Sequence, residues 1–207
     1  MELTETSYDA EDFVEVDLRD QRITGVSFTR CDFSGATLAG VKTKNVEFAE
    51  CVFTSAELYG SEHTASSFIG CTFDKTSWHG ATLTGCRLTG SSFTDCRIVP
   101  ITFADCDLTL SSFAGEKLAG TDLSGLRLRE ANLTGANLAG CNLTGADLTG
   151  ARTGNTDLRK ADLRGARTDA GLWVSARLAE AIIDLDQAML FAGAHGLVLA
   201  PPEHPEG

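Results

Sequence analysis

The chain has 207 residues, of which 43% are hydrophobic, and its formal net charge is −12. The excess of carboxylates argues against direct binding to nucleic acid, because affinity for phosphates comes from cationic side chains. The hydrophobic content suffices for a packed core and argues against general disorder, and no apolar run approaches the roughly 18 residues that a membrane-spanning helix needs.

We expect residues 1–10 to form an N-terminal tail that precedes the regular part of the chain. The chain begins MELTE, which is acidic and lacks the basic and apolar regions of a secretory signal. We therefore expect a cytoplasmic protein whose seven cysteines stay reduced.

Residues 11–183 follow a five-residue repeat. The stretch 131–150 reads ANLTG ANLAG CNLTG ADLTG, and steps of five from Phe13 to Ile183 give 35 central positions. All but four of these carry Leu, Ile, Phe or Trp, and the exceptions are Thr43, His63, Thr153 and Thr168. All seven cysteines lie two residues before a central position, where other repeats carry small residues. We expect these thiols to face inward as small hydrophobic groups, not to serve as ligands or nucleophiles.

A period of five is neither that of a helix nor that of a flat strand, and it indicates short straight pieces joined by corners. Phenylalanines recur in every fourth pentapeptide, which predicts four pentapeptides per coil and an inward ladder formed by Phe33, Phe53, Phe73, Phe93 and Phe113. Coils of this kind bury their interior only by stacking. At four units per coil and about 4.8 Å per coil, the rod would be roughly 42 Å long.

A C-terminal module follows where the repeat ends. Asp184 suits a helix N-cap, Gln187 completes a capping-box pattern, and Gly196 suits the position after a helix, so we expect a helix over 184–195. A short strand over 197–199 is expected next, so that the module spans 184–200, and residues 201–207 are expected to be disordered. The module covers the last coil as a cap or forms a homodimer contact, and the two are compatible because a dimer itself covers the end of the rod. The side chains expected in that contact are Leu185, Ala188, Met189, Phe191, Ala192, Leu197 and Val198.

The repeat register and the segments 151–154, 172–173 and 184–197 resemble the pentapeptide-repeat family. Within it, the likeness is to the mycobacterial fluoroquinolone-resistance subgroup, with the plasmid-borne quinolone-resistance (Qnr) proteins as more distant relatives. The resemblance implies an all-β solenoid, a right-handed quadrilateral β-helix with a short C-terminal helix that caps and dimerises. It also implies a homodimer that imitates duplex DNA, binds DNA gyrase through the ATPase region of its B subunit, and inhibits or protects the enzyme.

The acidic residues are concentrated away from the C-terminal module. Residues 1–110 carry a net charge of −9 and residues 111–207 a net charge of −3. The carboxylates expected to contact a partner are Glu47, Glu50, Glu57, Glu62, Asp95, Asp105 and Asp107. The alternative for each is a solvated residue that keeps the rod soluble. A dimer would carry about half of the roughly 50 charges of a duplex of equal length, so imitation would depend on local patches and shape.

No catalytic set, metal site or cofactor site is indicated by the sequence, and we do not expect an enzyme. His63 occupies an inward position, where we expect a tolerated polar insertion that hydrogen-bonds to Thr43 of the neighbouring coil. A basic run near the C-terminal end, from Arg152 to Arg167, is expected to pair with Asp157 and Asp162. The alternative function is a structural rod that serves as a scaffold for an unrelated partner, because fold alone does not set function.

Overall fold

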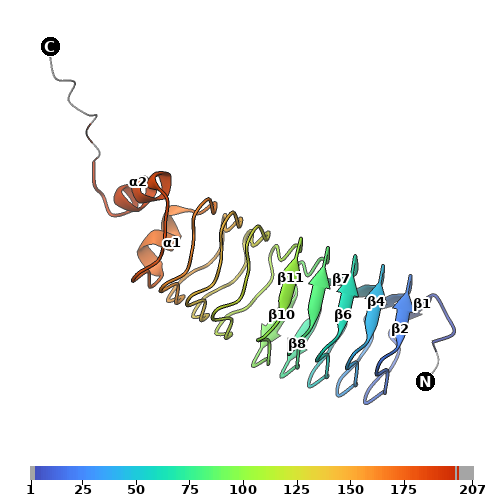
Figure 1. Cartoon of the computed structure of the whole chain (residues 1–207). Coiled ribbons are helices and arrows are strands. Elements are labelled where there is room, and N and C mark those ends of the chain that lie inside the picture. The colour runs from blue at the N-terminus through green and yellow to red at the C-terminus, as the bar shows by residue number, and fades with distance from the viewer. Residues whose placement is uncertain (1–2, 199, 201–207) are drawn as a thin grey trace, which may run out of the picture.

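The computed structural model describes residues 3–198 and 200. The chain forms a rod of stacked coils, with the N-terminus at one end and two helices at the other (Figure 1). Neighbouring coils pair in parallel with an offset of four pentapeptides, as where Phe28 lies opposite Phe48 and Phe48 opposite Phe68. This offset confirms four pentapeptides per coil, and the fold is the predicted parallel β-solenoid.

Each coil has four faces, which we number by their inward central residues. Face 1 contains Phe33 and Phe53, face 2 Leu38 and Leu58, face 3 Thr43 and His63, and face 4 Phe48 and Phe68. Face 4 holds the strands β1 (Ser7–Asp9), β3 (Ser27–Thr29), β5 (Glu47–Ala49) and β7 (Ser67–Ile69). Face 1 holds β8 (Thr72–Asp74) and β10 (Ser92–Thr94). Face 3 holds β2 (Arg22–Thr24), β4 (Lys42–Lys44), β6 (Glu62–Thr64), β9 (Thr82–Thr84) and β11 (Thr102–Ala104).

The solenoid starts earlier than the sequence predicts. Strand β1 lies inside the segment 1–10 for which a tail is predicted, and Tyr8 stacks on Phe28 at 5.2 Å between ring centroids. The hydrogen bonds of this first strand to β3 place it in the first coil. The prediction of a tail is therefore wrong for residues 7–9.

The predicted phenylalanine ladder runs through the interior of face 1. Successive rings from Phe13 to Phe113 lie 4.8, 5.0, 5.0, 4.8 and 4.4 Å apart between centroids, nearly parallel to one another. The rings of Phe28, Phe48 and Phe68 form a second column on face 4 that meets the first edge-to-face. Both arrangements are favourable for aromatic quadrupoles, and the shaft is filled by side chains.

The small inward position, which lies two residues before the central residue of each pentapeptide, carries a hydrogen-bond donor in many repeats. The Sγ atoms of Cys51, Cys71 and Cys106 each donate to the carbonyl oxygen of the residue 23 positions earlier, at 3.4 Å. Hydroxyls do the same where Thr76 donates to Phe53 and Ser91 donates to Phe68. Six of the seven thiols are buried and Cys96 is half-buried, which confirms that the cysteines face the interior.

Two helices end the rod. Helix α1 (Ala170–Ser175) replaces part of a coil, although the five-residue register continues through it and keeps Trp173 buried. Helix α2 (Leu185–Ala194) follows close to the predicted bounds, with the capping box between Asp184 and Gln187 present. Leu197 and Val198 form no strand, so the predicted strand is wrong at those residues. Leu199 and the expected disordered tail 201–207 lie outside the described residues.

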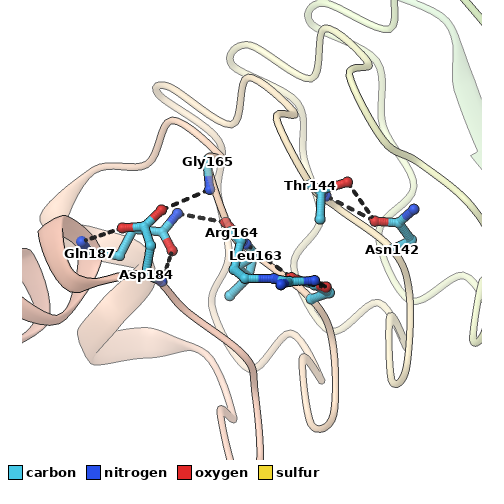
Figure 2. Close-up of polar contacts among 8 residues, drawn as sticks. Asn142, Thr144, Leu163, Arg164, Gly165, Asp184 and Gln187 are labelled. Carbon is cyan, nitrogen blue, oxygen red and sulfur yellow. Dashed lines mark hydrogen bonds and ion pairs between the residues drawn. The ribbon is translucent and has the colours of Figure 1, made fainter.

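An aspartate joins each helix to the coil below it. The Asp184 carboxylate accepts hydrogen bonds from the Gln187 amide at 2.9 Å and from the Gly165 amide at 2.8 Å (Figure 2). Asp169, the N-cap of α1, accepts from the Gly150 amide in the same way. Each carboxylate replaces the backbone carbonyl that the next coil would have supplied, so the solenoid ends without unpaired amides at these corners.

Candidate functional site

The seven predicted partner-binding carboxylates do not form one patch. Glu47 and Asp107 lie on face 4, Glu57 on face 2 and Glu62 on face 3, while the other three lie at corners between faces. The corner carboxylates are Glu50, Asp95 and Asp105, whose backbones have φ of 55°, 52° and 54°. All are exposed except Asp107, which is half-buried. Because the four faces point in different directions, carboxylates that are close in sequence can lie on different sides of the rod, as Glu57 and Glu62 do.

Two of these carboxylates are engaged within the chain. Glu62 forms an ion pair with Lys42 on the neighbouring strand at 2.6 Å. Asp107 forms an ion pair with Arg127 at 3.3 Å and accepts a hydrogen bond from the Thr109 hydroxyl. Burial acts to raise the pKa of Asp107, but the bonds from Thr109 and the Arg127 charge outweigh it and lower that pKa below its usual range. Both residues are therefore weaker candidates for contact with a partner.

In the first coils, acidic and basic side chains lie on different faces of the rod. The net charges of residues 1–110 and 111–207 do not reveal this separation. In the pentapeptides 11–15 and 31–35, the charges of face 1 and of the corner that follows it are all acidic, and these side chains are Glu11, Asp12, Glu15 and Asp32. In the pentapeptides 21–25 and 41–45, face 3 carries only basic charges, from Arg22, Lys42 and Lys44. Faces 1 and 3 are opposite sides of the coil, so the N-terminal end of the rod is electrically polarised across its width. The period of four pentapeptides, applied to the charges, would have revealed this.

The basic run near the C-terminal end is largely neutralised, as predicted. Arg159 pairs with Asp157 at 2.6 Å, and Arg164 pairs with Asp162 at 2.6 Å. The hydrogen bond from Arg159 holds the pKa of Asp157 well below its usual range, at about 2. Because these arginines already have anionic partners, this end is not a free cationic surface.

The predicted dimer contact residues form an apolar end face. Leu185, Met189, Phe191, Leu197 and Val198 are exposed, with Leu185 at 77% and Val198 at 95%, while Ala188 and Ala192 are half-buried. Three further apolar side chains that the sequence analysis missed are also exposed near this end, namely Val174, Ile182 and Leu190. Helix α2 thus buries Gln187 and leaves most of its large apolar side chains open to solvent.

A small apolar cavity lies beside this face. It has a volume of about 120 Å³ and is lined by Trp173, Leu178, Ala181, Ile183 and Phe191. The Phe191 ring meets Trp173 edge-on with centroids 6.2 Å apart. Exposed apolar side chains such as Leu185 and Met189 of helix α2 are of the kind that soluble proteins often cover with a partner.

No group of three or more His, Cys, Asp or Glu side chains among the described residues could hold a metal ion. No helix of the described part is long and apolar enough to cross a membrane. His63 is buried, with Nδ1 2.8 Å from the Thr43 hydroxyl and Nε2 2.9 Å from the Ser61 hydroxyl, so the predicted bond to Thr43 is confirmed.

The repeat, the coil geometry and the inward ladders together identify the family. The model of pentapeptide repeats matches residues 12–42, 31–62, 64–98, 106–145 and 141–167. The chain belongs to the pentapeptide-repeat family. No curated protein sequence matches this pentapeptide-repeat protein.

Two solved pentapeptide-repeat structures share the fold over nearly the whole rod. A trypsin-treated variant of QnrB1, described as a plasmid-mediated fluoroquinolone resistance protein, superposes with a TM-score of 0.81 at 21% identity, covering 94% of this chain and 97% of that one. Full-length QnrB1 superposes with a TM-score of 0.77 at 21% identity, covering 92% of this chain and 100% of that one. At this identity the likeness concerns the fold.

Proposed function

We propose that this protein is a cytoplasmic homodimer that binds DNA gyrase as an imitation of duplex DNA, and so inhibits the enzyme or protects it from quinolone-like poisons. The observation that carries the proposal is a packed rod in which positions 1–110 hold a net charge of −9. The shared fold with QnrB1, a fluoroquinolone resistance protein, supports it.

The mechanism is competition for a groove that normally holds DNA. A cationic groove wide enough for a duplex attracts an anionic rod over long range, which speeds encounter and fixes orientation. The polarised N-terminal coils would present face 1 to the enzyme and turn the cations of face 3 away. The implied target is the ATPase region of the gyrase B subunit.

The homodimer extends the rod. The exposed apolar residues around α2 would be buried against the same face of a second copy, in a two-fold contact of the commonest type among oligomers. A dimer of this kind places the acidic N-terminal coils at the two far ends of the assembly.

A supercoiling titration of purified gyrase, with and without a quinolone, tests this function. Addition of the protein at micromolar concentration and low salt is expected to inhibit supercoiling or to reduce drug-induced cleavage. Binding should weaken as ionic strength rises, because attraction between surface charges is screened. The proposal would be ruled out if the protein caused neither inhibition nor protection. It would also be ruled out if binding did not change with ionic strength.

Matched charge variants locate the contact surface. The combined change Asp12→Asn and Asp32→Asn on face 1 should weaken inhibition, whereas Lys42→Gln with Lys44→Gln on face 3 should leave it unchanged. At the corners, Glu50→Asn removes a charge while keeping a residue that tolerates positive φ, so loss of effect would reflect charge and not backbone strain.

The second candidate function is a scaffold rod for an unrelated partner. The dispersal of the predicted carboxylates over three faces and several corners favours it, because a duplex-sized groove contacts only one side of a rod. Capture of a different protein by the intact dimer, together with no effect on gyrase, would support this alternative.

A further inference from the structure

One pair of neighbouring coils is open along two faces. Between residues 95–105 and 114–125, all of which the structure describes, faces 2 and 3 lack the backbone hydrogen bonds that join coils elsewhere. In the preceding coils, the equivalent amides of Trp78 and Leu58 both donate to the next coil, at 2.8 and 2.7 Å. The amides of Ile98 and Phe103 have no such partner.

The same two coils are closed along the other two faces. On face 1 the Phe93 amide donates to Ser112 at 2.9 Å, and the rings of Phe93 and Phe113 stack at 4.4 Å between centroids. On face 4 the Leu108 amide donates to Arg127 at 2.8 Å. Faces 1 and 4 share one edge, and faces 2 and 3 share the opposite edge. The two coils are therefore hydrogen-bonded on both sides of the edge between faces 1 and 4 and are separated at the edge between faces 2 and 3.

A carboxylate lies at the start of the opening. Glu116 occupies the small inward position of face 2, where other coils carry small residues such as Ala56, Thr76 and Cys96, and Glu116 is only 5% exposed. Its Oε1 accepts a hydrogen bond from the Cys96 amide at 3.3 Å. Burial raises the pKa of Glu116, while the amides of Cys96 and Asp95 act in the opposite direction.

Glu116 differs from its counterparts in both size and chemistry. Ser91, at the small inward position of another pentapeptide, accepts from the Cys71 amide and donates to the Phe68 carbonyl. An ionised Glu116 accepts from an amide in the same way but has no proton to donate, and its longer side chain needs space between the coils. A cavity of about 400 Å³, lined by residues 95–99 and 115–117, marks that space.

Three further observations fit an opening at this edge. Pro100 lies at the corner between faces 2 and 3 and has no amide hydrogen to contribute to the ladder. The buried hydroxyl of Thr121, at the small inward position of face 3, makes no hydrogen bond. Phe103, the central residue of face 3, is 9% exposed, whereas Phe48 in a closed coil is 1% exposed. Water therefore reaches the interior more closely here than in the coils on either side.

We infer that the rod is articulated between these coils, with Glu116 as the wedge that parts them and the edge between faces 1 and 4 as the hinge. The device divides the solenoid into two rigid segments that can tilt relative to each other. The joint does not depend on the identity of the partner. A rod with such a joint can adjust its curvature to a binding groove, which a continuous ladder of hydrogen bonds would resist.

Amide hydrogen exchange measured by NMR on the full chain tests the joint. The amides of Ile98 and Phe103 should exchange at least on the order of a hundredfold faster than those of Trp78 and Leu108, because they lack ladder bonds. Glu116→Ser should restore the donor to the Phe93 carbonyl and slow exchange at Ile98 and Phe103 about tenfold or more. Glu116→Gln, which keeps the size of the wedge, should leave their exchange fast.

Two further measurements test the inference, one on the variant Ser91→Glu and one on the wild-type chain. Ser91→Glu should create a new opening and speed exchange at Trp78, provided that thermal unfolding shows the variant to be folded. If Glu116→Ser does not fold, the wild-type rates still decide. Protection of Ile98 and Phe103 equal to that of Trp78 would overturn the inference, and so would a folded Glu116→Ser variant whose exchange is unchanged.

Discussion

At the scale of single residues, the small inward position selects for a donor as much as for size. Thiols and hydroxyls there donate to carbonyls of the preceding coil, as Cys51 does to Phe28 and Thr156 does to Leu133. This explains why Cys, Ser, Thr and Ala alternate in the same column without changing the backbone. Ala provides the size but no donor, so its repeats depend on the ladder alone.

We predict that the thiols react slowly in the folded protein. Burial raises the pKa of Cys96 and of Cys141 to about 11, so that few thiolates form near neutral pH. Labelling with a coloured disulfide reagent should proceed first at the half-buried Cys96 and should reach all seven cysteines only in denaturant. Rapid labelling of Cys51 without denaturant would contradict inward packing.

We predict that His63 makes stability depend on pH. Burial lowers the pKa of His63 to about 3, while an unfolded His has a pKa of about 6.5. The unfolded state therefore binds the proton first, and the free energy of unfolding should fall by about 1.4 kcal/mol per pH unit below pH 6.5. Urea unfolding at pH 7.5 and pH 5.5 measures this, and His63→Leu should remove most of the difference.

At the scale of elements, the aromatic columns hold the N-terminal coils. We predict that Phe53→Ala, which removes a fully buried ring stacked between Phe33 and Phe73, lowers the free energy of unfolding by about 3–5 kcal/mol. Phe53→Leu should cost clearly less, because Leu133 occupies the same column farther along. Chemical denaturation of both variants makes the comparison. Equal costs would contradict the prediction, because they would mean that an aliphatic side chain does nothing to fill the site of the ring.

The start of helix α2 depends on one buried amide side chain. Gln187 donates from Nε2 to the carbonyl of Leu163 and completes the capping box with Asp184 (Figure 2). The same Nε2 also donates to the carbonyl of Ala166. We predict that Gln187→Leu destabilises this end by about 1–3 kcal/mol, since it leaves buried acceptors without a donor. Asp186→Asn, in the same helical turn but exposed, is the control and should change unfolding little.

At the scale of the whole molecule, the apolar end face predicts a dimer. The double variant Leu185→Asp and Met189→Asp adds charge to exposed side chains that the monomer does not need for its core. Light scattering coupled to size exclusion should report a dimer for the wild type and a monomer for the variant. A wild-type protein that remains monomeric at high micromolar concentration would argue for a cap without dimerisation.

The sequence was most informative about what repeats. A strict period of five, with phenylalanines in every fourth unit, determined the solenoid, the four faces, the inward cysteines and the Phe33 to Phe113 ladder. Each of these follows from the spacing alone, because identical units placed in register must bury the same side chains. Helix α2 was equally predictable from the sequence, because Asp184 and Gln187 form a capping-box pattern within four residues.

Features outside the repeat required the tertiary structure. Helix α1 was missed because the register continues through Trp173, and β1 was missed because Tyr8 lies before the first obvious repeat. The ion pairs of Glu62 with Lys42 and of Asp107 with Arg127, and the opening at Glu116, depend on how one coil meets the next. The sequence by itself thus decided which side chains face inward, since that is a property of each unit. Only the folded rod decided which charges pair with one another and where the stack parts, since those depend on contacts between units of successive coils.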